Sequence, residues 1–236
     1  MDTKTNSTNN VKTTVFNLII LDESGSMGGN TEQTISGCNE ILNVIREDEK
    51  NHSDTRRNLV SIYAFQSGGT PSRYLMKNAP AADVNDLTTE DYRPCGCTPL
   101  LDAIGMTLVD LEAIAATHED ADAVVTIFTD GYENSSTEYT YEKVAAIISR
   151  LKERGWTINF MGANIDEVTI GRKLNIDKEN IQSWESTQEG TYFAMRKVKR
   201  SMSNRYSSME EDKDMPVEMR CLSRKIRAKK FFDNKD

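Results

Sequence analysis

The sequence predicts an α/β fold: a doubly wound, mostly parallel sheet of six strands, with one antiparallel edge strand and helices on both faces. Two observations carry this prediction. Short apolar runs rich in β-branched residues alternate with longer segments in which apolar residues recur at helical spacing. In addition, the apolar runs at residues 15–21 and 123–129 each end at an Asp and a Gly-containing turn, which is typical of the ligand-binding edge of an open α/β sheet.

Each strand is predicted from an apolar run bounded by turn residues. The run at 15–21 is almost entirely apolar, as expected for a strand buried on both faces. Gly and Pro at 67–71 form a turn that lets the third strand return antiparallel beside the second. In chain order, strands are expected at residues 15–21, 59–65, 73–77, 123–129, 156–161 and, more weakly, 180–184.

Each helix is predicted from the spacing of its apolar residues and from the residues at its ends. Pro99 suits the first position of a helix, with Thr98 as the cap before it. Gly155 suits the end of the next long helix, and Ser186-Thr187-Gln188-Glu189 forms a capping box that opens the last one. In chain order, helices are expected at residues 31–49, 99–118, 140–154, 166–174 and from 186 to about 206.

The length of 236 residues suits one α/β domain, which we place at residues 13–206. Residues 1–12 are polar and lack the apolar core of a secretory signal, so we expect a disordered lead. Residues 207–236 carry an acidic run, then a basic run and few aliphatic residues, so we expect a solvated charged tail. Docking of the basic run to an acidic partner or to nucleic acid is the alternative.

The charge balance and the cysteines restrict the partners and the compartment. A formal net charge of −8 argues against nucleic acid as the main partner, and no apolar run is long enough to cross a membrane. Because residues 1–12 do not resemble a secretory signal, we expect a cytoplasmic protein whose cysteines are free thiols in a reducing compartment. Cys95-Gly96-Cys97 leaves a redox switch or a zinc half-site as alternatives. The four cysteines are Cys38, Cys95, Cys97 and Cys221.

The strand at 15–21 is followed directly by Asp22-Glu23-Ser24-Gly25-Ser26. Asp22, Ser24 and Ser26 bring three oxygen ligands to the carboxyl edge of the sheet. Such hard ligands suit Mg²⁺, Ca²⁺ or Mn²⁺ rather than zinc. The same residue types are common in strand-to-helix loops and at helix N-caps, so the segment alone leaves a purely structural role open.

Two distant segments supply matching oxygens. Thr98 precedes Pro99 at the start of a helix, and Asp130 follows the strand at 123–129 within Thr-Asp-Gly. Taken alone, Thr98 could be merely a helix cap and Asp130 merely a turn residue. Together with the first segment, however, they give two carboxylates and three hydroxyls, which would partly neutralise a divalent cation and leave it electrophilic. The predicted metal-site residues are Asp22, Ser24, Ser26, Thr98 and Asp130.

This pattern resembles the metal-ion-dependent adhesion site (MIDAS) of von Willebrand factor type A (vWA) domains, whose fold is Rossmann-like. That motif is Asp-x-Ser-x-Ser, then a distant Thr, then a distant Asp, and no position departs from it here. The resemblance covers about residues 15–202 and suggests a bacterial or phage intracellular type. It implies that Ser24, Ser26 and Thr98 contact the metal through their hydroxyls, whereas Asp22 and Asp130 act mostly through bound water and hydrogen bonds.

The resemblance also implies a function. The chain would be a metal-dependent protein-binding module and not an enzyme. Its cation, Mg²⁺ first and Mn²⁺ or Ca²⁺ otherwise, would take a Glu or Asp of a partner protein as its last ligand. One alternative is a Mg²⁺-dependent phosphotransferase or phosphatase with Asp22 as nucleophile, although such enzymes usually carry a second Asp where Ser24 stands, and the sequence has no phosphate loop or nucleophile elbow. The other alternative is a metal-free structural scaffold.

Overall fold

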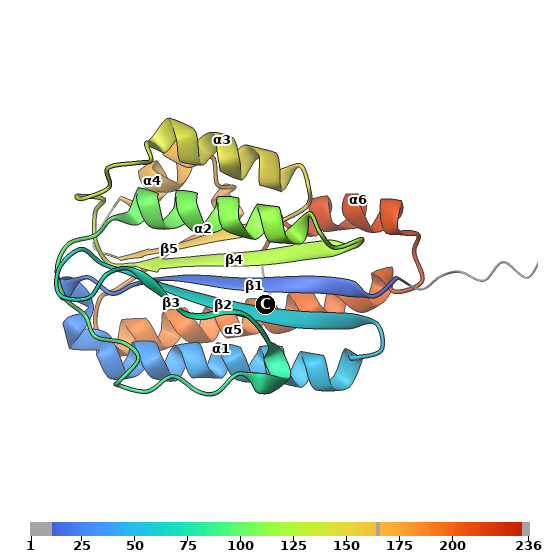
Figure 1. The fold of residues 1–236 in the computed structure, drawn as a ribbon, viewed down its shortest axis with the longest axis horizontal. Coiled ribbons are helices and arrows are strands. Elements are labelled where there is room, and N and C mark those ends of the chain that lie inside the picture. The colour runs from blue at the N-terminus through green and yellow to red at the C-terminus, as the bar shows by residue number, and fades with distance from the viewer. Residues whose placement is uncertain (1–10, 164–165, 233–236) are drawn as a thin grey trace, which may run out of the picture.

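The computed structural model describes residues 11–163 and 166–232. At its centre is a six-stranded sheet in the order β3-β2-β1-β4-β5-β6 (Figure 1). Strand β3 pairs antiparallel with β2, and the other neighbouring strands are parallel. The predicted fold class is therefore confirmed. The strands are β1 (Thr13–Asp22), β2 (Arg56–Phe65), β3 (Arg73–Pro80), β4 (Ala121–Thr129), β5 (Thr157–Ala163) and β6 (Ile181–Trp184).

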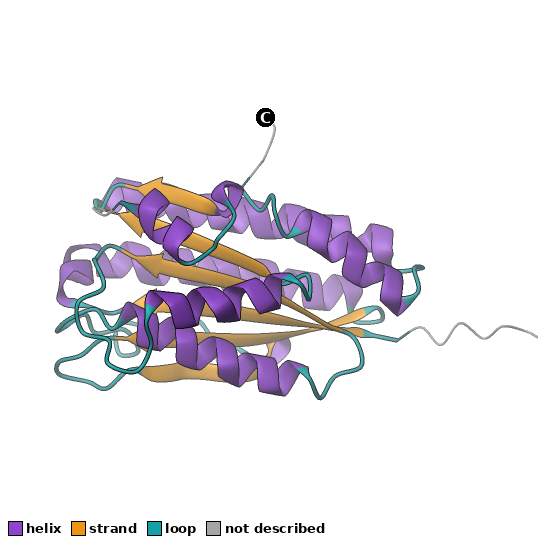
Figure 2. Ribbon diagram, turned by 90° about the horizontal axis from the view of Figure 1, so that it is seen from above, coloured by secondary structure: helices purple, strands orange, loops and turns teal. Residues whose placement is uncertain are grey.

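Helices cover both faces of the sheet. One face is covered by α1 and α5, and the other by α2, α3 and α4 (Figures 1 and 2). Across the described ranges, no helix is long and apolar enough to cross a membrane. The helices are α1 (Thr31–His52), α2 (Leu100–Ala115), α3 (Tyr141–Lys152), α4 (Glu167–Lys173), α5 (Gln188–Met209) and α6 (Val217–Arg227).

The central strand β1 explains why the sheet needs helices on both sides. All ten of its residues are buried. Because side chains alternate across a strand, Val15 and Ile19 pack into the core under α1 and α5, whereas Phe16 and Leu18 pack into the core under α2 and α3. An uninterrupted apolar run is what a strand covered on both faces requires, and this is the run that the sequence shows.

Strand β2 begins earlier than the sequence predicts, at Arg56 instead of residue 59. An Arg at the start of a buried strand breaks the apolar pattern, but the guanidinium of Arg56 is neutralised by Asp48 of α1, with Nε donating to Oδ2 at 2.7 Å. The cation is also 2.6 Å from Glu210. Local periodicity could not reveal this start, because the partners of Arg56 lie on other elements.

The structure differs from the expected domain end at residue 206. Helix α5 continues to Met209, and the basic run that follows forms α6. Phe231 and Phe232 are only 5% and 8% exposed and belong to the core under α1 and α5. Up to residue 232, the segment expected to be a solvated tail is therefore folded onto the domain. The expected lead at 1–12 lies outside the described residues, except for Val11 and Lys12.

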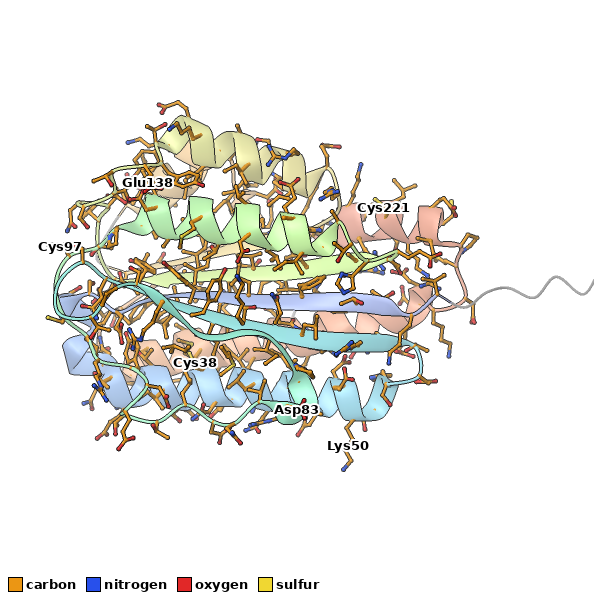
Figure 3. All side chains as sticks on the ribbon, viewed as in Figure 1. Cys38, Lys50, Asp83, Cys97, Glu138 and Cys221 are labelled. Carbon is orange, nitrogen blue, oxygen red and sulfur yellow. The ribbon has the colours of Figure 1, made fainter. Side chains whose placement is uncertain are left out.

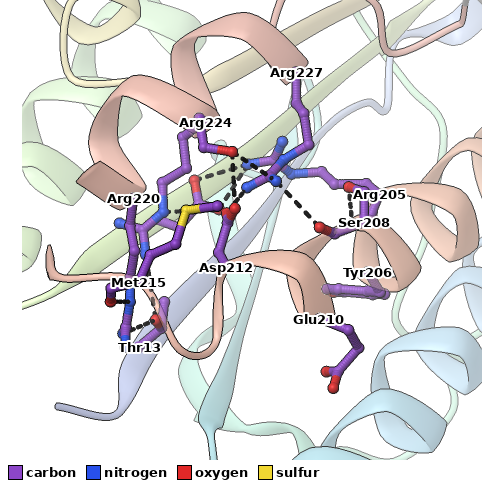
Figure 4. Close-up of polar contacts among 12 residues, drawn as sticks. Thr13, Arg205, Tyr206, Ser208, Glu210, Asp212, Met215, Arg220, Arg224 and Arg227 are labelled. Carbon is purple, nitrogen blue, oxygen red and sulfur yellow. Dashed lines mark hydrogen bonds and ion pairs between the residues drawn. The ribbon is translucent and has the colours of Figure 1, made fainter. Parts of the chain in front are cut away.

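Buried arginines attach α6 to the sheet. Figure 4 shows Arg220, Arg224 and Arg227 extending from one side of α6 toward the domain. Arg224 Nη1 lies 2.5 Å from Asp120 Oδ1, and Arg220 Nη1 lies 3.0 Å from Asp120 Oδ2. Asp120 immediately precedes β4, about a hundred residues earlier in the chain. The sequence suggests that these basic residues are solvent-exposed, because their acidic partner lies far away along the chain.

This attachment predicts a specific acid sensitivity. Burial alone would raise the pKa of Asp120, but hydrogen bonds and charge from Arg224, with further bonds from Thr13 and Arg220, outweigh it and lower the pKa below the ordinary carboxyl value of 3.8. The ion pair therefore stabilises the fold above roughly pH 4 and is lost as the pH falls through the lowered pKa.

Melting temperatures of the wild-type chain and of Asp120→Asn between pH 7 and pH 3 test this expectation. The variant should melt lower at pH 7, and the difference between the two proteins should shrink below roughly pH 4. A difference that stays constant down to pH 3 would contradict the proposed role of the ionised carboxylate.

Candidate metal centre

The predicted site residues lie at the carboxyl end of the parallel strands. Asp22 is the last residue of β1, and Asp130 directly follows β4, which is the neighbour of β1. Ser24 and Ser26 are in the turn after β1, where a short 3₁₀ helix (Gly25–Asn30) begins. Thr98 stands just before α2. Cys97, next to Thr98, labels this end of the molecule in Figure 3.

Hydrogen bonds connect four of these residues. The backbone N–H of Ser24 donates to Asp22 Oδ1 at 2.7 Å, which folds the turn back onto the end of β1. The hydroxyls of Ser24 and Ser26 are 3.1 Å apart. The Ser26 hydroxyl then donates to Asp130 Oδ1 at 2.5 Å. Oxygens from two segments, about a hundred residues apart in sequence, are thus gathered at one point.

Thr98 does not cap the helix that follows it. Helix α2 starts at Leu100 after Pro99, without a side-chain cap, and the backbone N–H of Leu101 instead donates to Glu133 Oε2 at 2.8 Å. Thr98 is nevertheless only 3% exposed. The expected capping role is therefore wrong, and the Thr98 hydroxyl is not engaged by the helix end.

Gly131 shows where that hydroxyl lies. A Cβ placed on Gly131 would be 3.0 Å from Thr98 Oγ1 and 3.8 Å from Ser26 Oγ. A side chain at Gly131 would crowd these hydroxyls, so the glycine lets hydroxyls from two separate loops approach the same point. Hard oxygen donors gathered in this way fit a small divalent cation of the Mg²⁺ type.

The charges at the site also favour a cation. Asp22 is fully buried, and its Oδ2 accepts a 2.5 Å hydrogen bond from the Thr129 hydroxyl. Burial raises the pKa of Asp22 to about 6, although hydrogen bonds from Thr129 and Ser24 lower it; the negative charge of Asp130 raises it further. A cation nearby would offset both effects, because opposite charge favours the ionised carboxylate.

Three residues outside the predicted set hold the site together. Thr129 binds the Asp22 carboxylate, and the Tyr92 hydroxyl donates to the backbone carbonyl of Asp22 at 2.5 Å. The Ser186 hydroxyl donates to Asp130 Oδ2 at 2.9 Å. Thr129 could have been found, since it stands inside the Thr-Asp-Gly segment, but nothing local points to Tyr92 or Ser186.

The expected capping box before α5 is wrong by one residue. Thr187 is the N-cap of α5, and its side chain accepts the backbone N–H of Gly190 at 3.0 Å. Ser186 is thereby left to contact Asp130 and to accept a hydrogen bond from Asn30 Nδ2 at 2.9 Å. The residue that looked like a helix cap is thus part of the candidate site.

Glu23, between the predicted ligands, has a structural role. It is fully buried and forms an ion pair with Arg73 of β3, with Nη1 2.7 Å from Oε2. The backbone carbonyl of Glu23 accepts the N–H of Cys95 at 2.9 Å, and the N–H of Gly25 donates to the carbonyl of Gly96 at 3.1 Å. The loop leading to Thr98 is therefore fixed beside the Ser24–Ser26 turn.

The cysteines are free thiols. Cys95 and Cys97 are exposed, Cys221 is partly buried and Cys38 is buried. Among residues 11–163 and 166–232, no three or more His, Cys, Asp or Glu side chains are grouped so that they could hold a metal ion.

No protein-family model matches the chain, and no curated protein matches it in sequence. Solved structures do share its fold. The pilus adhesin SpaC from Lactobacillus rhamnosus GG aligns with a TM-score of 0.61 and 14% identity over 84% of this chain and 31% of SpaC. The minor pilin PilB from Streptococcus sanguinis aligns with a TM-score of 0.53 and 12% identity, over 82% and 61% of the two chains.

A third similar structure is that of proximal thread matrix protein 1 from the mussel byssus, described with a zinc-occupied MIDAS motif. It aligns with a TM-score of 0.51 and 14% identity, over 82% of this chain and 46% of the mussel protein. The chain spans less than two thirds of each of these three proteins. At such identities the likeness concerns the fold alone, and that fold is vWA-like.

Proposed function

We propose that this vWA-like chain is a metal-dependent protein-binding module. The observation that carries the proposal is the convergence of the Thr98 and Ser26 hydroxyls beside Gly131, with Asp130 joined to Ser26. A divalent cation held there would supply positive charge to an incoming carboxylate. The structural likeness to a protein whose MIDAS motif binds zinc supports a divalent ion at this place in the fold.

Each residue has a distinct role in this proposal. Ser24, Ser26 and Thr98 would hold the metal through their hydroxyls. Asp22 and Asp130 would balance its charge and orient the serines, because Asp22 accepts from the Ser24 N–H and Asp130 accepts from the Ser26 hydroxyl. We propose Mg²⁺ first, with Mn²⁺ and Ca²⁺ as alternatives, since neutral hydroxyls and few direct carboxylates suit a small octahedral ion that keeps some of its water.

The expected partner is a protein that offers an acidic side chain. A cation held mainly by neutral hydroxyls retains much of its positive charge, so a Glu or Asp of the partner would complete its coordination. We propose binding in the cytoplasm, where the free thiols of Cys95 and Cys97 would remain reduced. Neither a membrane nor nucleic acid is needed in this account.

Two hydrogen bonds to Asp22 argue against the phosphotransferase alternative. A nucleophilic Asp must present a free carboxylate oxygen to its substrate. Asp22 is fully buried, with Oδ1 accepting from the Ser24 N–H and Oδ2 accepting from the Thr129 hydroxyl. Both oxygens are thus engaged in holding the loop, and a metal-binding role accounts for the residue better.

Capture of a partner from a cell extract tests the proposal. Immobilised full-length chain should retain a protein in Mg²⁺, release it in a chelator and retain it again when Mg²⁺ is restored. Replacing the partner's acidic residue at the contact should abolish retention. Binding that persists in chelator would favour the metal-free scaffold.

Thr98→Ala should separate binding from stability. Because the Thr98 hydroxyl makes no helix cap, its loss should lower the free energy of unfolding by less than about 1 kcal/mol, yet weaken Mg²⁺-dependent capture at least tenfold. Thr140→Ala is the matched control, since Thr140 does cap α3 by accepting from the Lys143 N–H. It should lose about 1 kcal/mol of stability and bind normally. Equal partner binding by both variants would contradict the role of Thr98.

A further inference from the structure

Helix α6 packs its charged side against the domain and leaves its apolar side exposed. The side packed on the domain carries Arg220 and Arg224, which are 5% and 4% exposed. The outer side carries Met219, Leu222 and Ile226, which are 53%, 55% and 63% exposed. A surface helix normally buries its apolar side, so the outer row is an unusual surface to leave in water.

The row cannot be buried by rotating the helix. Arg224 and Arg220 are held by Asp120 at 2.5 and 3.0 Å, which fixes the orientation of α6 on the sheet. Leaving Asp120 buried without those partners would cost several kcal/mol. The apolar row therefore stays outside as long as the domain is folded.

Residues 11–163 and 166–232 leave the row exposed. Residues 1–10, 164–165 and 233–236 lie outside the described part, and by sequence only Met1 and Ile165 among them are apolar. A second molecule could cover the row. The spacing of the apolar residues in the row suits a helix as the partner element. Residues 219, 222 and 226 follow the three-four spacing with which one helix packs along another.

The charges beside the row favour a second copy of the same helix. Acidic residues, Asp214 and Glu218, flank its beginning, and basic residues, Lys225 and Lys229, flank its end. An antiparallel pair brings each acidic end beside a basic end, whereas a parallel pair sets like charges side by side. An isologous two-fold interface needs a surface that is complementary to itself. The surface around the apolar row meets this condition, because its acidic end matches its basic end.

We propose that two copies of the chain associate through their α6 helices, antiparallel and centred between Arg220 and Cys221. Met219 would pack against Leu222 of the second copy. Glu218 would pair with Lys225 of the second copy. Lys225 is at present 3.2 Å from Glu153, whose side chain is 82% exposed, and such an exposed pair is worth little and exchanges readily.

The position of α6 makes this dimer compatible with partner binding. Cys221, on α6, and Cys97, beside the candidate metal centre, are labelled at opposite ends of the molecule in Figure 3. Pairing through α6 therefore leaves both metal loops accessible. Two such sites in one particle would bind a multivalent partner far more tightly than one site does.

Sedimentation velocity of the full chain between about 10 µM and about 1 mM tests the pairing, because a small interface associates in this range. The wild-type chain should shift from monomer to dimer, and Leu222→Glu should raise the dimer dissociation constant at least tenfold. Val109→Glu is the matched control, since Val109 is an exposed apolar residue on α2. It should dimerise like the wild type, and both variants should keep the wild-type melting temperature.

A charge exchange tests the antiparallel arrangement. Glu218→Lys and Lys225→Glu should each weaken the dimer, and the double variant should restore it to within about threefold of the wild type. A chain that stays monomeric throughout the concentration range would overturn the proposal, as would a dimer that tolerates Leu222→Glu. A monomer that binds vesicles of anionic phospholipid through Leu222 would also overturn it, in favour of a membrane contact.

Discussion

Removal of residues 209–236 is expected to unfold the domain. The truncation deletes Phe231 and Phe232 from the core under α1 and α5, and it strips Asp120 of both arginine partners. Loss of one buried Phe side chain costs about 3–5 kcal/mol, and an unpaired buried charge costs a similar amount. A domain of this size has only about 5–15 kcal/mol of stability in total. Circular dichroism and the soluble yield of the truncated chain measure the effect.

A single substitution isolates the part played by the ion pair. Arg224→Met should lower the free energy of unfolding by about 3–5 kcal/mol, because it leaves the buried Asp120 carboxylate short of its main partner. Lys229→Met removes an exposed charge from the same basic run and should change stability by less than about 0.5 kcal/mol. If the truncated chain stayed soluble and melted within a few degrees of the full chain, residues 209–236 would be a dispensable tail after all.

The second large effect is expected at Asp130. Asp130→Asn keeps the size and shape of the side chain and leaves one oxygen to accept from Ser26 or Ser186, which now donate to different oxygens. It also removes a negative charge beside the cation. We expect divalent-metal affinity to fall about 10–100-fold or more. The rise in melting temperature on adding Mg²⁺ or Mn²⁺ measures it, because a ligand at about 100 times its dissociation constant adds about 2.7 kcal/mol.

Asp22 is a less suitable position for this test. Its carboxylate holds the Thr129 hydroxyl and the Ser24 N–H in a fully buried place, so Asp22→Ala should lose stability as well as metal. Asp83→Asn is a better control for Asp130→Asn. Asp83 lies in the short helix after β3, well away from the candidate centre in Figure 3, and its substitution should leave the metal-induced shift unchanged.

Features that depend on neighbours in sequence could be predicted well. The apolar run of β1, with Asp22 at its end, follows from burial on both faces and needs no information from the rest of the chain. The antiparallel return of β3 follows from the turn before Arg73. The five candidate metal-site residues could be named because their oxygens stand at the ends of strands or helices, and such ends are visible in the sequence.

Features that depend on distant pairs could not be predicted. The basic residues of α6 look solvated until Asp120 is placed beneath them. Ser186 looks like part of a capping box until Asp130 is seen to lie within 2.9 Å of it. Thr98 looks like a cap, although at the N-terminus of α2 it is Glu133, from another loop, that accepts a backbone N–H. In each case, the local sequence suggests one role for the residue, but a contact with a distant part of the chain gives it another.

Titration calorimetry of the full-length chain with Mg²⁺ and Mn²⁺ tests the central claim most directly. We expect one divalent ion per chain, bound by the wild type and by Asp83→Asn, with affinity reduced at least tenfold in Asp130→Asn and in Ser26→Ala. The claim would be contradicted if Mg²⁺, Mn²⁺ and Ca²⁺ all failed to bind at millimolar concentration, or if binding were unchanged when Asp130 or Ser26 is replaced.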